Sequence, residues 1–361
     1  MSRSWNFYAG PAVLPVPALE RARAEMLDWE GTGMSVMETS HRSKEYDAVH
    51  HQAMALFKEL LGLDDDHQVL FLGGGASLQF AMVPMNFIPP GGSADYIVTG
   101  SWAKKAMKEA NIVAKARAAA SSEADKFMRL PRHGEIDVDP KAAYVHLTSN
   151  NTIYGTQWKD FPVPGAVPMV ADMSSDLLWR PFDANAFHLI YGGAQKNMGP
   201  AGLTLVIIRK SWLEKANDAL PTMLKYSTHV KEESLYNTPP VFAIYMLRNV
   251  LLWVKENGGL AGMERRNRAK GDRLYGVIDS HAGFYTCPVE KASRSYMNVI
   301  FRLPSEELEA KLVAAARDAR MFGLKGHRSV GGCRASLYNA MGIEGVEALA
   351  QFMEEFARKN G

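Results

Sequence analysis

A lysine in a glycine-rich bend is the residue around which chemistry can be built in this sequence. Lys196 lies in Gly-Gly-Ala-Gln-Lys-Asn-Met-Gly-Pro-Ala-Gly, between two apolar runs, 187–191 and 203–208, that we predict to be short buried strands. An ammonium group at the end of buried strands is partly desolvated, which lowers its pKa and frees the amine for a Schiff base. Most turn lysines are simply solvated. Other residues of the sequence must therefore indicate whether Lys196 is a solvated turn residue or a Schiff-base lysine.

Two other strand ends carry groups that such a lysine would need. Asp172 follows a predicted strand, 167–171, where a carboxylate either caps a helix or requires a cation or N–H partner. The run Gly73-Gly74-Gly75 precedes Ala76 and Ser77 at a predicted strand-to-helix turn, which favours a phosphate at the helix N-terminus. The turn matches neither Gly-x-Gly-x-x-Gly nor the Walker pattern, so a dinucleotide or nucleotide is not favoured. A lysine for an aldehyde, an aspartate for a ring nitrogen and a phosphate cradle together indicate pyridoxal 5'-phosphate.

Two His-Arg pairs predict an anion pocket. His41-Arg42 lies in an early loop, and His327-Arg328 lies in a late glycine-rich turn with Arg334 close behind. Arginine forks bind carboxylates and phosphates bidentately, and the histidines add donors. Each pair alone is more often a solvated loop; together they predict a pocket where a large and a small domain meet.

The elements that must position these residues alternate strands and helices. Six strand candidates, 68–72, 96–99, 144–148, 167–171, 187–191 and 203–208, are spaced for crossover connections. This predicts an α/β fold in which a mostly parallel sheet is flanked by helices, with ligands beyond the carboxyl ends of the strands. We expect an N-terminal arm (1–15) that packs on the small domain, a large cofactor-binding domain (16–258) and a smaller α+β domain (259–361). The alanine-rich segment 114–124 is expected to be surface helix or loop.

Composition excludes several classes of function. With 41 Lys and Arg against 39 Asp and Glu, no overall charge favours nucleic acid or an anionic membrane surface. Two cysteines without CxxC spacing, and no histidine cluster, predict neither a metal site nor a disulfide framework. No apolar run approaches the length of a membrane span, and the N-terminus lacks the apolar core of a signal peptide, so we expect a cytoplasmic protein.

Several motifs spread over the whole chain carry a family resemblance. They are the arm that ends in Ala-Gly-Pro, Val-Met-Glu-Thr-Ser-His-Arg, the Lys196 bend, Tyr-Asn-Thr-Pro-Pro, and Lys-Gly-His-Arg-Ser-Val-Gly-Gly-Cys-Arg-Ala-Ser. Together they resemble the phosphoserine aminotransferases, in the class V branch of fold type I pyridoxal phosphate enzymes. Some relatives carry a basic residue at the position of Ser77, so less charge faces the ligands here.

The resemblance implies a role for each motif residue. Lys196 would be the Schiff-base lysine and Asp172 the partner of the ring nitrogen. The remaining cofactor contacts would come from Ala76, Ser77, Trp102, Thr152 and Gln195, and, across the interface of a homodimer, from Asn237 and Thr238. The resemblance also implies that Arg334 clamps the substrate α-carboxylate while His41, Arg42, His327 and Arg328 hold the distal group.

The implied reaction is reversible amino transfer from L-glutamate to 3-phosphohydroxypyruvate, which gives O-phospho-L-serine and 2-oxoglutarate. This is a step of serine biosynthesis, and the related phosphohydroxythreonine step of vitamin B6 synthesis is a further substrate option. Two alternatives stay open: a cysteine desulfurase or other class V enzyme, and a non-catalytic sensor that binds the cofactor. A desulfurase needs a nucleophilic cysteine on a mobile loop, whereas Cys287 and Cys333 look like packing residues.

Overall fold

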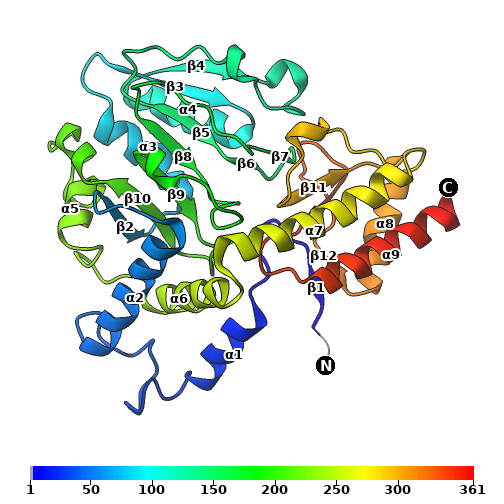
Figure 1. The fold of residues 1–361 in the computed structure, drawn as a ribbon, viewed down its shortest axis with the longest axis horizontal. Coiled ribbons are helices and arrows are strands. Elements are labelled where there is room, and N and C mark those ends of the chain that lie inside the picture. Colours follow the sequence, from blue (N-terminus) through cyan, green and yellow to red (C-terminus); the bar gives the residue numbers. More distant parts are fainter. Residues whose placement is uncertain (1–2) are drawn as a thin grey trace.

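The computed structural model describes residues 3–361 and is built around one seven-stranded sheet (Figure 1). The sheet order is β2-β10-β9-β8-β5-β3-β4. All neighbours run parallel except β10, which is antiparallel to β2 and β9. The predicted α/β class with a mostly parallel sheet is therefore confirmed. The strands are β2 (His67–Leu72), β3 (Ser93–Val98), β4 (Lys115–Ser121), β5 (Val145–Thr148), β8 (Met169–Asp172), β9 (Leu189–Gly193) and β10 (Thr204–Arg209).

Helices cover both faces of this sheet. Along β2, Val69 and Phe71 pack with helices α2 (Lys44–Leu61) and α6 (Val241–Glu256), whereas Leu70 and Leu72 pack with α3 (Gly75–Phe87) and α4 (Ser101–Val113). The two-residue period of a strand explains this, since successive side chains point to opposite faces. The inner strands therefore bury both faces, and polar groups lie at their ends.

Local capping signals set the ends of α2. Ser43 caps α2 by accepting a hydrogen bond from the Tyr46 N–H, and Gly62 ends that helix with a φ of 60°. The first helix is α1 (Val16–Ala24). Short α5 (Tyr226–Lys231) precedes the loop that leads to α6.

The expectation for the alanine-rich segment is wrong. Residues 115–121 form β4, which pairs parallel to β3 at the edge of the sheet. Alanine favours helix, but the free edge of β3 offers a row of backbone hydrogen bonds, and Ala119 and Ala120 become buried there. Tertiary pairing therefore overrides the local preference.

A second hydrophobic core lies to the right of the sheet in Figure 1. It gathers α7 (Gly259–Ser280), α8 (Glu306–Asp318), α9 (Ile343–Asn360) and the antiparallel pair of β11 (Asn298–Phe301) and β13 (Cys333–Ser336). In the arm, β1 (Trp5–Asn6) pairs parallel with β12 (Met321–Phe322), and Phe7 is buried in this core.

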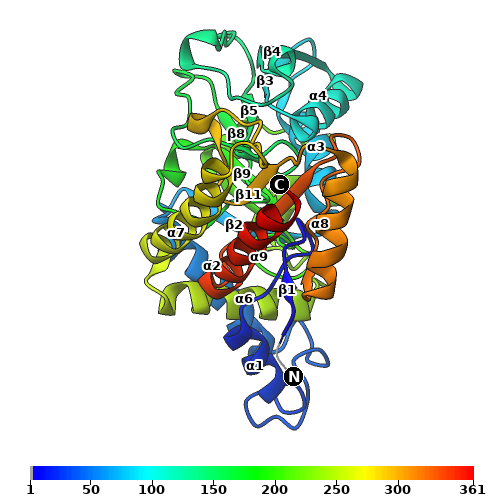
Figure 2. The same ribbon diagram turned by 90° about the vertical axis from the view of Figure 1, so that its right-hand side faces the viewer.

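Helix α7 belongs to both cores. Leu260 and Met263 in its first half pack with the sheet, whereas Leu274 and Ile278 in its second half pack with the small core. Figure 2 shows α7 and α9 side by side along this junction. The division of the chain at residues 258 and 259 stays a prediction; α7 begins at Gly259, and the two halves of this helix pack in different cores.

A short hairpin also bridges the two cores. It consists of β6 (Asn150–Asn151) and β7 (Thr156–Gln157), which follow β5. The Asn150 Nδ2 donates to the Asn298 Oδ1 of β11 at 2.8 Å, and the Ser295 N–H donates to the Gly155 carbonyl at 2.9 Å. No helix within residues 3–361 is long and apolar enough to cross a membrane.

Candidate active site

A cavity of about 680 Å³ opens at the carboxyl ends of the parallel strands. Its floor comes from the ends of β8 and β9, and its walls come from the first turns of α3 and α4 and from the small core. This is where ligands bind in open α/β sheets. The predicted site residues that line it are Ala76, Ser77, Trp102, Thr152, Asp172, Gln195, Lys196, His327 and Arg334.

Asp172 and Lys196 face the cavity from neighbouring strand ends. Asp172, the last residue of β8, is 5% exposed and accepts hydrogen bonds from the Ser174 N–H (3.0 Å) and hydroxyl (2.6 Å). The Ser174 Oγ in turn accepts from the Gly193 N–H at 3.1 Å, which joins this turn to the end of β9. Ser174 thus holds the carboxylate, and the Gly193 N–H holds Ser174 in turn.

Burial sets the charge balance of this pair. It lowers the pKa of Lys196, and Arg334 lowers it further, while the charge of Asp172 raises it. Burial raises the pKa of Asp172, whereas Lys196 and the hydrogen bonds from Ser174 lower it. Within residues 3–361 no direct ion pair joins the two groups, so the amine stays free for a ligand.

Trp102, Thr152 and Arg334 form the opposite wall. The Lys196 Nζ lies 5.3 Å from the centroid of the Trp102 ring, and the indole N–H donates to the Thr152 Oγ1 at 3.3 Å. The Arg334 Nη1 donates to the Thr152 carbonyl at 2.8 Å, but its buried Nε has no partner. No carboxylate among residues 3–361 pairs with this guanidinium, and its burial lowers its pKa. A buried cation without a counter-ion is a site for an anionic ligand.

The first turn of α3 presents unpaired backbone donors to the same cavity. Gly74 caps the helix without any side-chain hydrogen bond, and Gly74 and Gly75 have φ values of 81° and 66°. A Cβ at Gly74 would lie 2.6 Å from the Leu78 side chain, so this left-handed turn requires glycine. The N–H groups of Ala76 and Ser77 are then available to a phosphate.

The N-terminal arm supplies a wall that the sequence did not predict. Ala9, Gly10 and Pro11 line the cavity, and a Cβ at Gly10 would lie 3.3 Å from the Lys196 Cγ. The Ala12 N–H donates to the Gln195 carbonyl at 2.8 Å, next to the lysine. Gly10 and Pro11 were the available signal in the sequence, but they predicted only an arm that packs on the small domain. Ser174, two residues after Asp172, was also missed.

Five predicted residues do not line this cavity. Arg42, Asn237, Thr238 and Arg328 are exposed, and His41 is half-buried with an Nε2 that has no hydrogen-bond partner. They lie in the loops before α2, before α6 and before β13. One chain therefore assembles the part of the site around Lys196 and leaves these loops outside it.

The two cysteines are poorly placed for nucleophilic chemistry. Neither lines the cavity, and burial raises the pKa of Cys287 and raises that of Cys333 to about 12. Because the thiolate is the reactive form, both are weak nucleophiles at neutral pH.

Comparisons with known proteins match the chain over nearly its full length. The family model for class V aminotransferases matches residues 4–349. A phosphoserine aminotransferase of Herpetosiphon aurantiacus is 56% identical over 357 residues, which cover 99% of both chains. The solved phosphoserine aminotransferase of Bacillus circulans subsp. alkalophilus superposes with a TM-score of 0.98 at 55% identity and covers 99% of both chains. A PLP-bound phosphoserine aminotransferase of Trichomonas vaginalis superposes with a TM-score of 0.93 at 38% identity, over 98% of this chain and 100% of that one.

Proposed function

The chain belongs to the class V aminotransferase family, as its motifs predict, and we propose that it transfers an amino group reversibly from L-glutamate to 3-phosphohydroxypyruvate. The products are O-phospho-L-serine and 2-oxoglutarate, so the reaction is a step of serine biosynthesis. The observation that carries the proposal is one cavity that holds a free half-buried amine, a buried carboxylate and a half-buried guanidinium without a counter-ion.

The residues present fit pyridoxal phosphate. The uncapped first turn of α3 suits its phosphate, Asp172 suits its ring nitrogen, and the Trp102 ring beside Lys196 suits its flat face. The Thr152 hydroxyl would donate near the ring oxygen, and Gln195 would join Ala76 and Ser77 at the phosphate. When bound, the cofactor supplies an aldehyde for the amino group and an electron sink.

The chain's own residues would then handle one proton and two anions. Burial lowers the pKa of Lys196, so this residue is available as a neutral amine. The amine would take a proton from the substrate α-carbon and then return a proton during the same half-reaction. Asp172 would keep the ring nitrogen of the cofactor protonated, because Ser174 holds its carboxylate in place. Arg334 would bind the substrate α-carboxylate and so orient the α-carbon toward the lysine.

We propose that a second copy of the chain completes the site. Support comes from the four exposed polar residues Arg42, Asn237, Thr238 and Arg328, which have no place in the cavity of one chain. Helix α1 and the loop after it extend below the body in both ribbon views, and this segment exposes Leu27 (84%), Met34 and Met37 (Figures 1 and 2). A projecting apolar segment of this kind is typical of a subunit interface. In the homodimer, Asn237 and Thr238 would reach the partner's cofactor phosphate, and His41 and Arg42 would join His327 and Arg328 around the distal group.

A cytoplasmic location is also proposed. Both cysteines are free thiols, which is the usual state in a reducing compartment. A cysteine desulfurase activity gains no support, because neither thiol faces the cavity.

A coupled assay tests the proposed reaction directly. With glutamate as donor, the enzyme is offered phosphorylated and plain 2-oxo acids of matched length, including the phosphorylated acid that precedes phosphohydroxythreonine. We expect a strong preference for phosphorylated acceptors, because cationic and planar donors would surround the distal position in the proposed dimer. Equal use of plain acids, or release of sulfide from cysteine at a higher rate, would contradict the proposal.

A further inference from the structure

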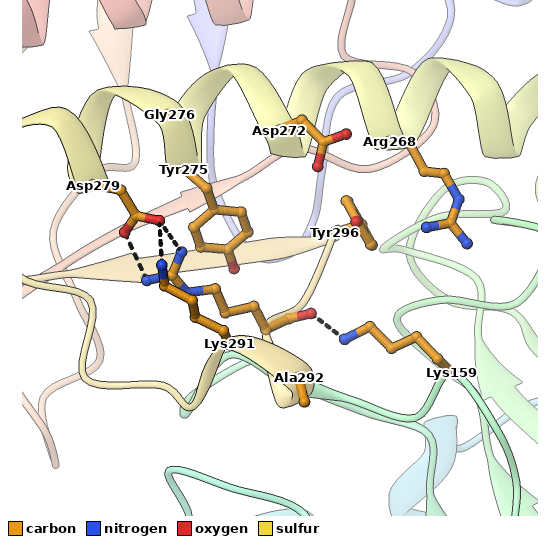
Figure 3. Close-up of a pocket in the computed structure, with 10 residues that line it drawn as sticks. Lys159, Arg268, Asp272, Tyr275, Gly276, Asp279, Lys291, Ala292 and Tyr296 are labelled. Carbon is orange, nitrogen blue, oxygen red and sulfur yellow. Dashed lines mark hydrogen bonds and ion pairs between the residues drawn. The ribbon is translucent and has the colours of Figure 1, made fainter.

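A second cavity, of about 440 Å³, lies at the junction of the two cores and shares no residue with the candidate active site (Figure 3). One side is the outer face of α7, and the other is the segment 291–296 that leads to β11. Lys159, just after the β6–β7 hairpin, closes one end. Figure 3 shows Asp279 at the opposite end, where it pairs with Lys291 and Arg294.

Backbone carbonyls, rather than a carboxylate, hold the Nζ of the half-buried Lys159. Its Nζ donates to the carbonyl of Gln157 at 3.2 Å and to the carbonyl of Arg294. Two of its donors therefore bridge the hairpin and the small core, and no carboxylate within residues 3–361 forms an ion pair with it. The third position on the Lys159 Nζ makes no hydrogen bond within residues 3–361 and is open to the cavity.

Its surroundings favour the neutral amine. Burial, together with the charges of Arg268 and Arg180, lowers the pKa of Lys159 to about 7, although the charge of Asp176 opposes this shift. A solvated lysine has a pKa of about 10.4 and is almost fully protonated at neutral pH. Lys159 therefore combines access from a cavity with a substantial fraction of free amine.

The cavity walls carry more positive than negative side chains. Arg268 lies 5.3 Å from the centroid of the Tyr296 ring, and the Lys159 Nζ lies 5.8 Å from the same ring. Lys291 and Arg294 add two more cations, which share the single carboxylate of Asp279. Asp272 is the second carboxylate of the wall, and Arg268 pairs with Glu264 at 2.7 Å. Such walls attract small anions to the amine.

We propose that Lys159 is a modification site that accepts an acyl group from small anionic donors of the acyl phosphate class. The nitrogen lone pair attacks the acyl carbon and forms an N–C bond. The C–O bond to the phosphate breaks, the phosphate leaves with that electron pair, and the extra proton on nitrogen passes to water. No oxidant or reductant is involved.

Acylation would change the joint between the cores. The amide keeps one N–H and loses the charge, so either Gln157 or Arg294 loses its donor. The Gln157 side chain also accepts from the Tyr296 N–H (2.9 Å) and donates to the buried Asp176 (3.0 Å). We therefore expect the modified protein to melt at a lower temperature than the unmodified one.

Two other lysines serve as internal controls for the test. Lys270 has its pKa lowered by burial to about 7 as well, but it is 1% exposed and donates to the carbonyls of Leu337, Tyr338 and Met341. Lys291 lines the same cavity but is exposed and pairs with Asp279. Comparison with Lys270 thus tests whether access from the cavity is needed, and comparison with Lys291 tests the effect of burial on the reactivity of the amine.

The experiment treats the holoenzyme with acetyl phosphate at pH 7 and follows each lysine by site-resolved mass spectrometry. The higher fraction of free amine, partly offset by its lower basicity, predicts that Lys159 reacts about tenfold faster than Lys291. Lys270 should stay unmodified. Reaction of Lys159 at or below the rate of Lys291 would overturn the proposal, and so would equal reaction of Lys270 in the folded protein.

A variant tests the class of donor. Arg268→Gln removes an exposed cation of the wall and should slow acetylation of Lys159 severalfold with acetyl phosphate, but much less with an uncharged acetyl ester. An equal effect on both donors would show that Arg268 does not select anions, which contradicts the proposed class.

Discussion

The two halves of the candidate active site are built in opposite ways. The half around Lys196 is buried, and its polar atoms are fixed by neighbours in the same chain, as the Ser174 bonds to Asp172 illustrate. The other half would hold the partner's cofactor phosphate through Asn237 and Thr238 and the distal group through Arg42 and Arg328. These four residues are exposed and lie outside the cavity of one chain. We propose that the inner half holds the cofactor ring within one chain, whereas the outer half is completed by a second chain.

This difference separates two kinds of substitution. Changes in the inner half should act on the chemical step in every assay. Changes in the outer half should act on binding, and their effect should depend on a second chain. Substitutions in either half therefore test this division.

Loss of the amine should have the largest effect. Lys196→Ala should reduce transamination by about 10⁴-fold or more, because both cofactor attachment and proton transfer depend on this group. The visible absorption of the lysine-bound cofactor should disappear as well. Lys210→Ala, an exposed lysine after β10, is the control and should stay close to wild type. A Lys196→Ala variant that keeps both activity and absorption would refute the assignment.

Arg334 should affect binding more than turnover. Arg334→Gln removes a half-buried guanidinium that has no counter-ion, so the KM for glutamate should rise about 10²-fold with a smaller change in kcat. Steady-state kinetics with varied glutamate measure this. Arg317→Gln, on the exposed face of α8, controls for loss of a positive charge. An unchanged KM would mean that Arg334 is only a structural link to Thr152.

Substitution of Asn237 should moderately weaken binding of the cofactor and leave the other steps close to normal. Asn237→Ala should raise the concentration of pyridoxal phosphate needed for half-saturation about tenfold, as expected for one lost hydrogen bond to a charged group. Activity at saturating cofactor should be close to normal. If the residue only shapes the loop before α6, the melting temperature will fall while the affinity for the cofactor stays the same.

The smallest effect is a pair of opposite shifts with pH. Uptake of the cofactor by the apo form needs neutral Lys196, so its rate should rise with pH. Asp172 raises the pKa of Lys196, so Asp172→Asn should move this rise to lower pH. Arg334 lowers that pKa, so Arg334→Gln should move the rise to higher pH. Stopped-flow absorbance at several pH values measures both, and shifts in the same direction would contradict the charge balance described here.

The inner half could be predicted from the sequence because its signals are local. Lys196 and Asp172 each follow a short apolar run, and the periodicity of such runs is enough to place both at one sheet edge. The turn at Gly74 carries its own signal, since the left-handed backbone there excludes other residues.

The remaining features depend on contacts between distant segments. The alanine-rich run became β4 because β3 had a free edge, and nothing within residues 115–121 records that. Gly10 reaches Lys196 only because β1 pairs with β12 and directs the arm across the cavity. The position of Arg42 outside the cavity likewise follows from how loops are arranged in space, so the sequence could assign it a function but not a place.

Complementation between two inactive chains tests the shared site most directly. Chains carrying Lys196→Ala and chains carrying Arg42→Ala are co-expressed with different tags, and the mixed dimers are purified and assayed. If Arg42 acts on the partner's cavity, each mixed dimer contains one intact site and should show about half the activity of the wild-type dimer. If Arg42 acts within its own chain, neither site is intact, and activity no higher than that of the two parent variants would contradict the account.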